Sequence, residues 1–469
     1  MALGEQSPPA QGQTLPDGVL QPDTMRLGLL LGMVQFLIWG GSASTWAAYT
    51  ELYIARECDA RGVHPCKKDT VGYDACNDAA SDTVFMFGLF SGLVSLLACP
   101  AVGVLGDTYG RKPALLFCCT GGFLYSLATV LLPASAQNTW LFALSLVTSL
   151  GGGFFAPVSV CFASLADATA GQGQRVRARL FGMVEACIWA GDLVGPTLGG
   201  IAIQRVGTQR SFVVSTAMYG ANVLMILLLY VDTLPQAKRR PFDWRKANPL
   251  GSMWLLMRYP FTALYMAVIF FSLSGTSGGT TITPLYAQGT FDFDALHIGY
   301  VQTTTFAANA LGLFCVLPLC IRAGVPLRTL VIVATAWNAV TWGCWAALDS
   351  GWQLYALGAA QVLSAMYLPC VRTIVSSAFG PTLYGTSLAA LSTVQQVTAM
   401  GAPAASAKLW KRMGKTAYIC CGVFSAFGTL AALATPLRQS LVEPADTPPE
   451  SNSQSRALLA EEEAVKESE

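Results

Sequence analysis

The stretch GVLGDTYGRKPAL, residues 103–115, lies where one apolar run, residues 83–105, gives way to another, residues 113–132. Both runs have about the 20 residues that a helix needs to cross the hydrocarbon core of a bilayer. Gly103 allows neighbouring helices to approach closely. Gly110 permits a tight turn where a side chain would clash. The stretch therefore predicts two membrane helices joined by a short turn.

Three charged residues, Asp107, Arg111 and Lys112, mark this turn, and its cations favour a cytoplasmic position. With its glycines the stretch reads G-x-L-x-D-x-x-G-R-K-P-x-L, which resembles the loop between the second and third helices in the major facilitator superfamily. We expect Asp107 and Arg111 to form a cytoplasmic gate with Asp167, at the end of the fourth apolar run. Opposite charges at adjacent helix ends attract more strongly where water is scarce. The two glycines and Lys112 complete the expected gate.

The composition separates this chain from soluble proteins. Of its 469 residues, 53% are hydrophobic and 12% are charged, whereas soluble domains carry about 25% charged residues. The formal net charge is +1, so nothing indicates binding to nucleic acid. His64 and His297 are the only histidines, which excludes a histidine-based metal cluster, and no phosphate loop of the P-loop type occurs. We therefore expect a membrane protein that is not an enzyme, with no catalytic residues, cofactor or metal.

Twelve apolar runs are long enough to span a membrane, and one long basic connector divides them six and six. Two six-helix halves are the internal repeat of many transporters. The predicted fold is therefore an all-α membrane protein with twelve transmembrane helices in two six-helix halves, the major facilitator fold. The predicted spans are residues 27–49, 83–105, 113–132, 139–165, 178–203, 211–231, 260–285, 298–320, 330–347, 352–379, 385–409 and 416–435.

The spans also predict the order of regions along the chain. We expect a disordered cytoplasmic N-terminus, a first six-helix bundle, a basic cytoplasmic linker, a second six-helix bundle and a disordered, acidic cytoplasmic tail. An even number of spans puts both termini on the side of the basic loops. The protein is then a multi-pass protein of the plasma membrane or of the vacuolar or lysosomal membrane. The regions are residues 1–24, 25–232, 233–259, 260–436 and 437–469.

Few charged side chains lie inside the predicted spans, and such charges are functional candidates. Glu185 and Asp192 lie in the fifth span, seven residues or nearly two helical turns apart, so they share a face. Burial disfavours a charged carboxylate, so such a group can bind a proton in one conformation and release it in another. Both are candidates for proton coupling, Glu185 the favoured one, with structural pairing as the alternative.

Arg372 lies in the tenth span, just after Pro369. Because arginine does not deprotonate in proteins, we expect Arg372 to be a counter-ion for a carboxylate or an anchor for an anionic substrate. Gln35 and Gln395 are neutral candidates for lining the same cavity.

The fifth span contains a pattern of small residues, G-x-x-x-G-P-x-x-G-G. It is similar to the antiporter signature of drug and tetracycline exporters. Small residues allow close helix packing, and a proline favours a kink. The residues expected to serve this packing are Gly191, Gly195, Pro196, Gly199 and Gly200.

A wider resemblance is to the proton-coupled folate and haem carrier family. It rests on residues 163–167, on the segment 175–185, on residues 285–286 with 298–300, and on the pattern from Pro369 to Gly385. This resemblance implies a proton-coupling role for Glu185. The positions it implicates in transport are Asp107, Arg111, Asp167, Glu185 and Arg372.

The longest loop on the far side, residues 51–82, contains Cys58, Cys66 and Cys76. A disulfide between two of them fits an oxidising face, and three unpaired thiols are the alternative.

These patterns predict a secondary active transporter of a small organic solute, working by proton-coupled symport of an organic anion through alternating access. One alternative is a proton-driven antiporter of the drug or tetracycline type. Another, from a different class, is a transporter-like receptor or scaffold. The expected partners are the lipid bilayer, a small organic solute and protons, and no nucleic acid, while the oligomeric state is open.

Overall fold

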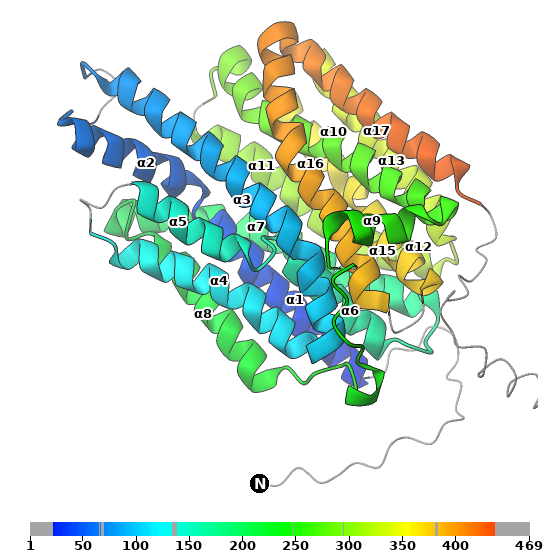
Figure 1. The fold of residues 1–469 in the computed structure, drawn as a ribbon. Helices are drawn as coiled ribbons and strands as arrows, with labels where there is room; N and C mark the ends of the chain where they lie inside the picture. The colour runs from blue at the N-terminus through cyan, green and yellow to red at the C-terminus, as the bar shows by residue number, and fades with distance from the viewer. Residues whose placement is uncertain are drawn as a thin grey trace, which may run out of the picture.

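The computed structural model describes residues 22–64, 66, 70–133, 138–245, 247–293, 295–379 and 383–436. Helices dominate these residues, and no strand occurs among them (Figure 1). The predicted disordered tail, residues 437–469, and residues 1–21 of the predicted N-terminal region lie outside the described residues. The fold is therefore all-helical over the described part, as the sequence predicted.

Eight α-helices precede the linker among the described residues. They are α1 (Pro22–Ala43), α2 (Trp46–Arg61), α3 (Tyr73–Tyr109), α4 (Arg111–Leu131), α5 (Asn138–Ser149), α6 (Phe155–Ala168), α7 (Gln174–Val206) and α8 (Phe212–Leu229).

The linker and the second part of the chain contain the remaining α-helices. They are α9 (Pro249–Met257), α10 (Pro260–Phe291), α11 (Ala295–Leu311), α12 (Leu317–Arg322), α13 (Leu327–Cys344), α14 (Trp352–Ala360), α15 (Tyr367–Ala378), α16 (Tyr384–Met413) and α17 (Ala417–Ala434).

Ten helical segments among the described residues are long and apolar enough to cross a membrane. The predicted fourth span, residues 139–165, is not continuous, because α5 ends at Ser149 and α6 begins at Phe155. Gly152 and Gly153 lie in this break with φ of 79° and 62°, a left-handed conformation that glycine adopts without steric cost. The sequence prediction of one unbroken helix was wrong here.

The predicted far-side loop, residues 51–82, is largely helical. Helix α2 runs to Arg61 and ends at Gly62, whose φ is 67°, and α3 begins at Tyr73. The segment is rich in charged residues, which led to its prediction as a loop. However, Ala, Glu and Arg are also strong helix formers, so the helices continue beyond the apolar runs.

The two parts of the chain meet along a few helix pairs. Helix α16 packs on α3 and α6, and α7 packs on α11 and α15. One hydrophobic core runs through both parts, with Val102 and Phe162 from the first and Val371 and Leu391 from the second. These pairs bring α3, α6 and α7 of the first part against α11, α15 and α16 of the second.

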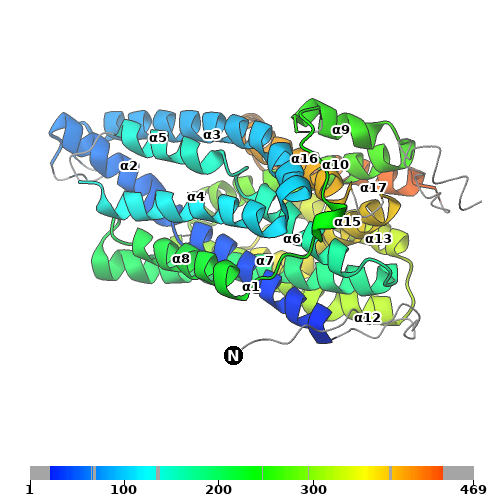
Figure 2. The same cartoon turned by 60° about the horizontal axis from the view of Figure 1, so that its bottom comes forward.

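The predicted linker, residues 233–259, is partly ordered into a short helix. Asn248 caps α9 by accepting a hydrogen bond from the Gly251 N–H at 2.6 Å, and Pro249 occupies the first turn, where a missing N–H costs nothing. Helix α9 packs on α16, α10 and α3 and lies on the outside of the bundle (Figure 2). We call the end of the bundle that carries residues 232–258 the linker side, and the end that carries α2 the far side.

Candidate functional site

The turn between α3 and α4 is built around Gly110, whose φ of 110° suits glycine. A Cβ atom at this position would collide with the Asp232 carboxylate. That carboxylate accepts a hydrogen bond from the Arg111 N–H at 3.0 Å. Glycine has no side chain to cap a helix, so Asp232, 121 residues away, caps α4 in its place.

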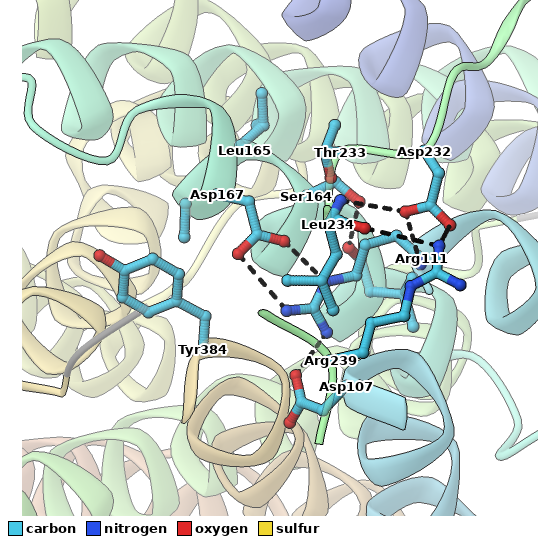
Figure 3. Close-up of polar contacts among 12 residues, drawn as sticks. Asp107, Arg111, Ser164, Leu165, Asp167, Asp232, Thr233, Leu234, Arg239 and Tyr384 are labelled. Carbon is cyan, nitrogen blue, oxygen red and sulfur yellow. Dashed lines mark hydrogen bonds and ion pairs between the residues drawn. The ribbon is translucent and has the colours of Figure 1, made fainter. Parts of the chain in front are cut away.

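Arg111 is buried between two carboxylates (Figure 3). Its Nη1 donates to Asp107 Oδ1 at 2.6 Å, and its Nε donates to Asp167 Oδ2 at 2.8 Å. Arg111 is 1% exposed, so these ion pairs are poorly screened by water. The structure brings together the three charged residues that the sequence proposed as a gate, from α3, α4 and α6.

Asp107 also reaches the second part of the chain. Its Oδ2 accepts hydrogen bonds from the Thr386 N–H at 3.0 Å and the Thr386 hydroxyl at 2.8 Å. Thr386 lies in the first turn of α16, where free N–H groups and the helix dipole favour an anion. The close approach needs two glycines, because a Cβ on Gly103 would meet Ala389 and one on Gly385 would meet Asp107 and Arg111.

Lys112 lies outside this buried set. Its Nζ donates to the Leu227 carbonyl at 2.9 Å in an exposed position near the end of α8. A cation there complements the carbonyl groups that a helix leaves unsatisfied at its C-terminus. Lys112 therefore fastens α4 to α8 within the first part of the chain.

A second buried arginine links the two parts of the chain at this end. Arg177 of α7 is 4% exposed. Its Nε donates to the Thr169 hydroxyl at 3.0 Å, and its Nη2 donates to the Tyr384 hydroxyl at 3.1 Å. The guanidinium also lies 5.0 Å from the centre of the Tyr384 ring. Its Nη1 donates to Ser376 and Ser377 of α15 at 3.4 and 3.3 Å.

An ion pair joins α7 and α15 deeper in the bundle. Arg372 Nη1 donates to Glu185 Oε2, and Arg372 Nη2 donates to Gln395 Oε1 of α16 at 2.9 Å. The Arg372 guanidinium also lies 4.3 Å from the centre of the Phe162 ring, a cation–π contact. Arg372 and Glu185 are 2% and 3% exposed. Arg372 is therefore already neutralised by an acid from the other half.

A cavity lies beside this ion pair. Trp189 lies one helical turn after Glu185, and Leu368 lies one turn before Arg372, and both line the cavity. Thr276, Asn309 and Gln361 also belong to its lining, although the surface that the cavity exposes is mostly apolar. Its volume of about 20 Å³ has room for about one water molecule in this state.

A family profile described as Major Facilitator Superfamily matches residues 31–403. The chain belongs to the major facilitator superfamily. The crystal structure of the human organic anion transporter MFSD10 (TETRAN) superposes with a TM-score of 0.72 at 17% identity, covering 89% of this chain and 100% of that one. At this identity the likeness establishes the fold alone.

Several curated members of the superfamily are similar in sequence. The mouse hippocampus abundant transcript 1 protein is 24% identical over 302 residues, 63% of this chain and 59% of that protein. The Escherichia coli tetracycline resistance protein, class C, is 24% identical over 343 residues, 70% of this chain and 83% of that protein. The chain thus spans about three fifths of the first relative's length.

Gln35 and Asp192, two other candidates from the sequence, do not take part in the Glu185–Arg372 ion pair. Gln35 donates to Cys161 Sγ at 3.1 Å and accepts from Trp39 Nε1 at 3.2 Å, so it ties α1 to α6. Asp192 is 5% exposed, and within the described residues its Oδ1 has no hydrogen-bond partner.

The glycines of the fifth predicted span line the seam between α1 and α7. A Cβ on Gly191, Gly195 or Gly199 would collide with backbone atoms of Gly40 in α1 or of Ser44, which directly follows α1. The other two residues of the pattern behave differently. Pro196 is exposed, and a Cβ on Gly200 would meet no heavy atom within 4 Å.

The far side contains a disulfide between Cys58 and Cys66, while Cys76 is a buried free thiol. No group of three or more potential metal-ligating side chains gathers anywhere in the described ranges. Sequence reasoning missed Asp232 and Arg177 as site residues. Both lie in basic segments that the sequence alone marks only as loops, and their distant partners lie 121 to 207 residues away.

Proposed function

We propose that this protein is a secondary active transporter that carries a small organic anion together with a proton by alternating access. The observation that carries the proposal is the buried Glu185–Arg372 ion pair, which joins the two halves beside a small cavity. The human organic anion transporter of the same fold supports the anionic substrate class.

The pair provides a direct route to coupling. In this structure the Glu185 carboxylate accepts a hydrogen bond from the Arg372 guanidinium. An anionic substrate would therefore compete with Glu185 for the same cation. A proton that binds Glu185 removes the competing charge and leaves Arg372 free to bind the substrate. Proton and anion then load together, and both must leave before the pair can form again. Gln395 holds the guanidinium in place during the exchange.

The cluster of Asp107, Arg111 and Asp167 acts as a gate in this proposal. It closes the linker side, because Asp107 binds the start of α16 and so holds the two halves together. The bias of cations toward this side supports its assignment to the cytoplasm. The described state then faces the far side. Twelve spanning helices in two halves, residues 25–232 and 260–436, complete the proposed architecture.

Uptake into proteoliposomes tests the coupling. The purified chain is reconstituted, a proton gradient is imposed, and a panel of radiolabelled organic anions is screened for accumulation. Once an accumulated anion is found, Glu185→Gln is compared with the unchanged protein. The variant should lose gradient-driven accumulation and retain exchange of internal for external anion, because its amide mimics the protonated acid.

Two control variants make the result interpretable. Asp349→Asn alters an exposed carboxylate and should leave both activities unchanged. Asp192→Asn alters the competing buried carboxylate. If Asp192→Asn alone loses accumulation, the proton site moves to Asp192. If both buried-acid variants still accumulate the anion, coupling to protons is refuted.

A drug or tetracycline-type antiporter is the second candidate. It is supported by the tight glycine seam between α1 and α7 and by the similarity to tetracycline resistance proteins. The direction of the gradient separates the two candidates, because an antiporter accumulates substrate when the vesicle interior is acidic. A transporter-like receptor or scaffold would still bind its partner after the Glu185–Arg372 pair is removed.

A further inference from the structure

The linker presents an unusual surface for a connector between two membrane bundles. Leu250, Trp254 and Met257 recur every three or four residues on one face of α9, and they are 81%, 68% and 53% exposed. Trp244, just before the helix, is 78% exposed. The opposite face, which includes the fully buried Leu256, packs on the bundle. The apolar outer face is therefore not used within the described protein.

Exposed cations flank this face. Lys238 precedes it, Arg245 adjoins Trp244, and Arg258 ends α9. Tryptophan is enriched at the level of lipid headgroups, and an amphipathic helix with cations beside its apolar face lies in the interface of a membrane. Cations close to a membrane attract anionic headgroups, with about a fivefold gain in affinity for each. The combination fits an anionic phospholipid surface.

The same segment is attached to the gate on its other side. The Arg240 N–H donates to the Asp107 carbonyl at 3.2 Å, and Asp232 binds both the Arg111 N–H and, at 3.3 Å, the Arg239 guanidinium. Helix α9 packs on α16, whose first turn receives Asp107. The linker therefore contacts both sides of the hydrogen bonds between Asp107 and Thr386. An interaction that immobilises the linker should stabilise those hydrogen bonds.

We propose that residues 238–245 and 247–258 bind anionic phospholipid headgroups and that this binding holds the gate closed. The proposal of lipid binding rests only on the exposed apolar face of α9 and on the cations that flank it. The effect on the gate rests on the proposed function of the Asp107 cluster. The consequence is a transporter whose conformational equilibrium depends on the charge of the leaflet at its linker side.

Hydrogen–deuterium exchange of the full chain in lipid nanodiscs tests this proposal without a substrate. Nanodiscs of phosphatidylcholine alone are compared with nanodiscs that contain equal parts of phosphatidylcholine and phosphatidylglycerol. Anionic lipid should slow exchange in peptides covering residues 103–115, residues 238–258 and the start of α16. Lys238→Gln, Arg245→Gln and Arg258→Gln together should abolish that difference, because about a hundredfold in affinity is lost when three cations are removed.

The matched control replaces three exposed far-side arginines, Arg205, Arg210 and Arg412, by glutamine. It removes the same charge and should keep the lipid effect. If anionic lipid slows hydrogen–deuterium exchange only in residues 238–258, lipid binding is supported and its effect on the gate is refuted. Equal exchange in both lipid mixtures, or an effect that survives the triple change on the linker, would overturn the whole proposal. Since this readout needs no transport, its failure is distinguishable from failure of the coupling mechanism.

Discussion

Removing one member of the buried Glu185–Arg372 pair is the sharpest test of the site. Three variants form a double-mutant cycle: Glu185→Gln, Arg372→Gln and the two together. Each single change leaves one polar or charged group of the pair without its partner. Because both side chains are nearly fully buried, with side-chain exposures of 4% and 2%, water cannot replace the lost interaction. The double variant removes both charges.

The expected magnitude follows from the surroundings of each group. Breaking a buried ion pair by removing one partner costs about 3–5 kcal/mol. Arg372 keeps Gln395 and the Phe162 ring when Glu185 is replaced, so we expect the lower end, about 3 kcal/mol. The double variant should cost less than the sum of the single changes by about 2 kcal/mol or more, because it leaves no uncompensated buried charge.

Equilibrium unfolding of the purified protein in mixed micelles, followed by circular dichroism, measures these differences. Lys415→Gln is the control, because it breaks an ion pair of 3.9 Å between exposed side chains, which should cost less than about 1 kcal/mol. If the two single changes add to within about 0.5 kcal/mol, the two side chains are not coupled. The ion pair, and the competition mechanism built on it, would then be refuted.

Three further outcomes are expected. Asp107→Ala should lower the transport turnover number about tenfold and change the KM much less, because it removes charge-assisted hydrogen bonds of the gate; equal effects on both constants would point to misfolding. Arg177→Gln should also lower the transport turnover number. Arg177→Lys should restore little of it, because lysine lacks the planar guanidinium that reaches Thr169 and Tyr384 together. Full rescue of uptake by lysine would exclude a geometric role for Arg177. Asp192→Asn should stabilise the protein against unfolding by about 1–3 kcal/mol, because the wild-type carboxylate is buried with an unsatisfied oxygen; a loss of stability would indicate a partner for Asp192.

Local patterns in the sequence determined the class of this protein. Apolar runs of membrane-spanning length predicted helices, because a backbone in lipid must satisfy its own hydrogen bonds. The turn at Gly110 and the charges of Asp107 and Arg111 were readable because they lie within one short stretch. Membership in the major facilitator superfamily follows from the same kind of local signal.

Other features depended on how the helices pack. The partner of Arg372 is Glu185, 187 residues away, so the sequence left its role open between counter-ion and substrate anchor. The cap of α4 by Asp232 and the bonds from Arg177 to α15 and Tyr384 arise only where loops and helix ends meet. The break between α5 and α6 depends on glycine φ angles that apolar periodicity does not encode. Sequence fixes which residues enter the bilayer, because that depends on their own transfer energies, whereas tertiary packing decides which buried charges meet, because that depends on the approach of distant helices.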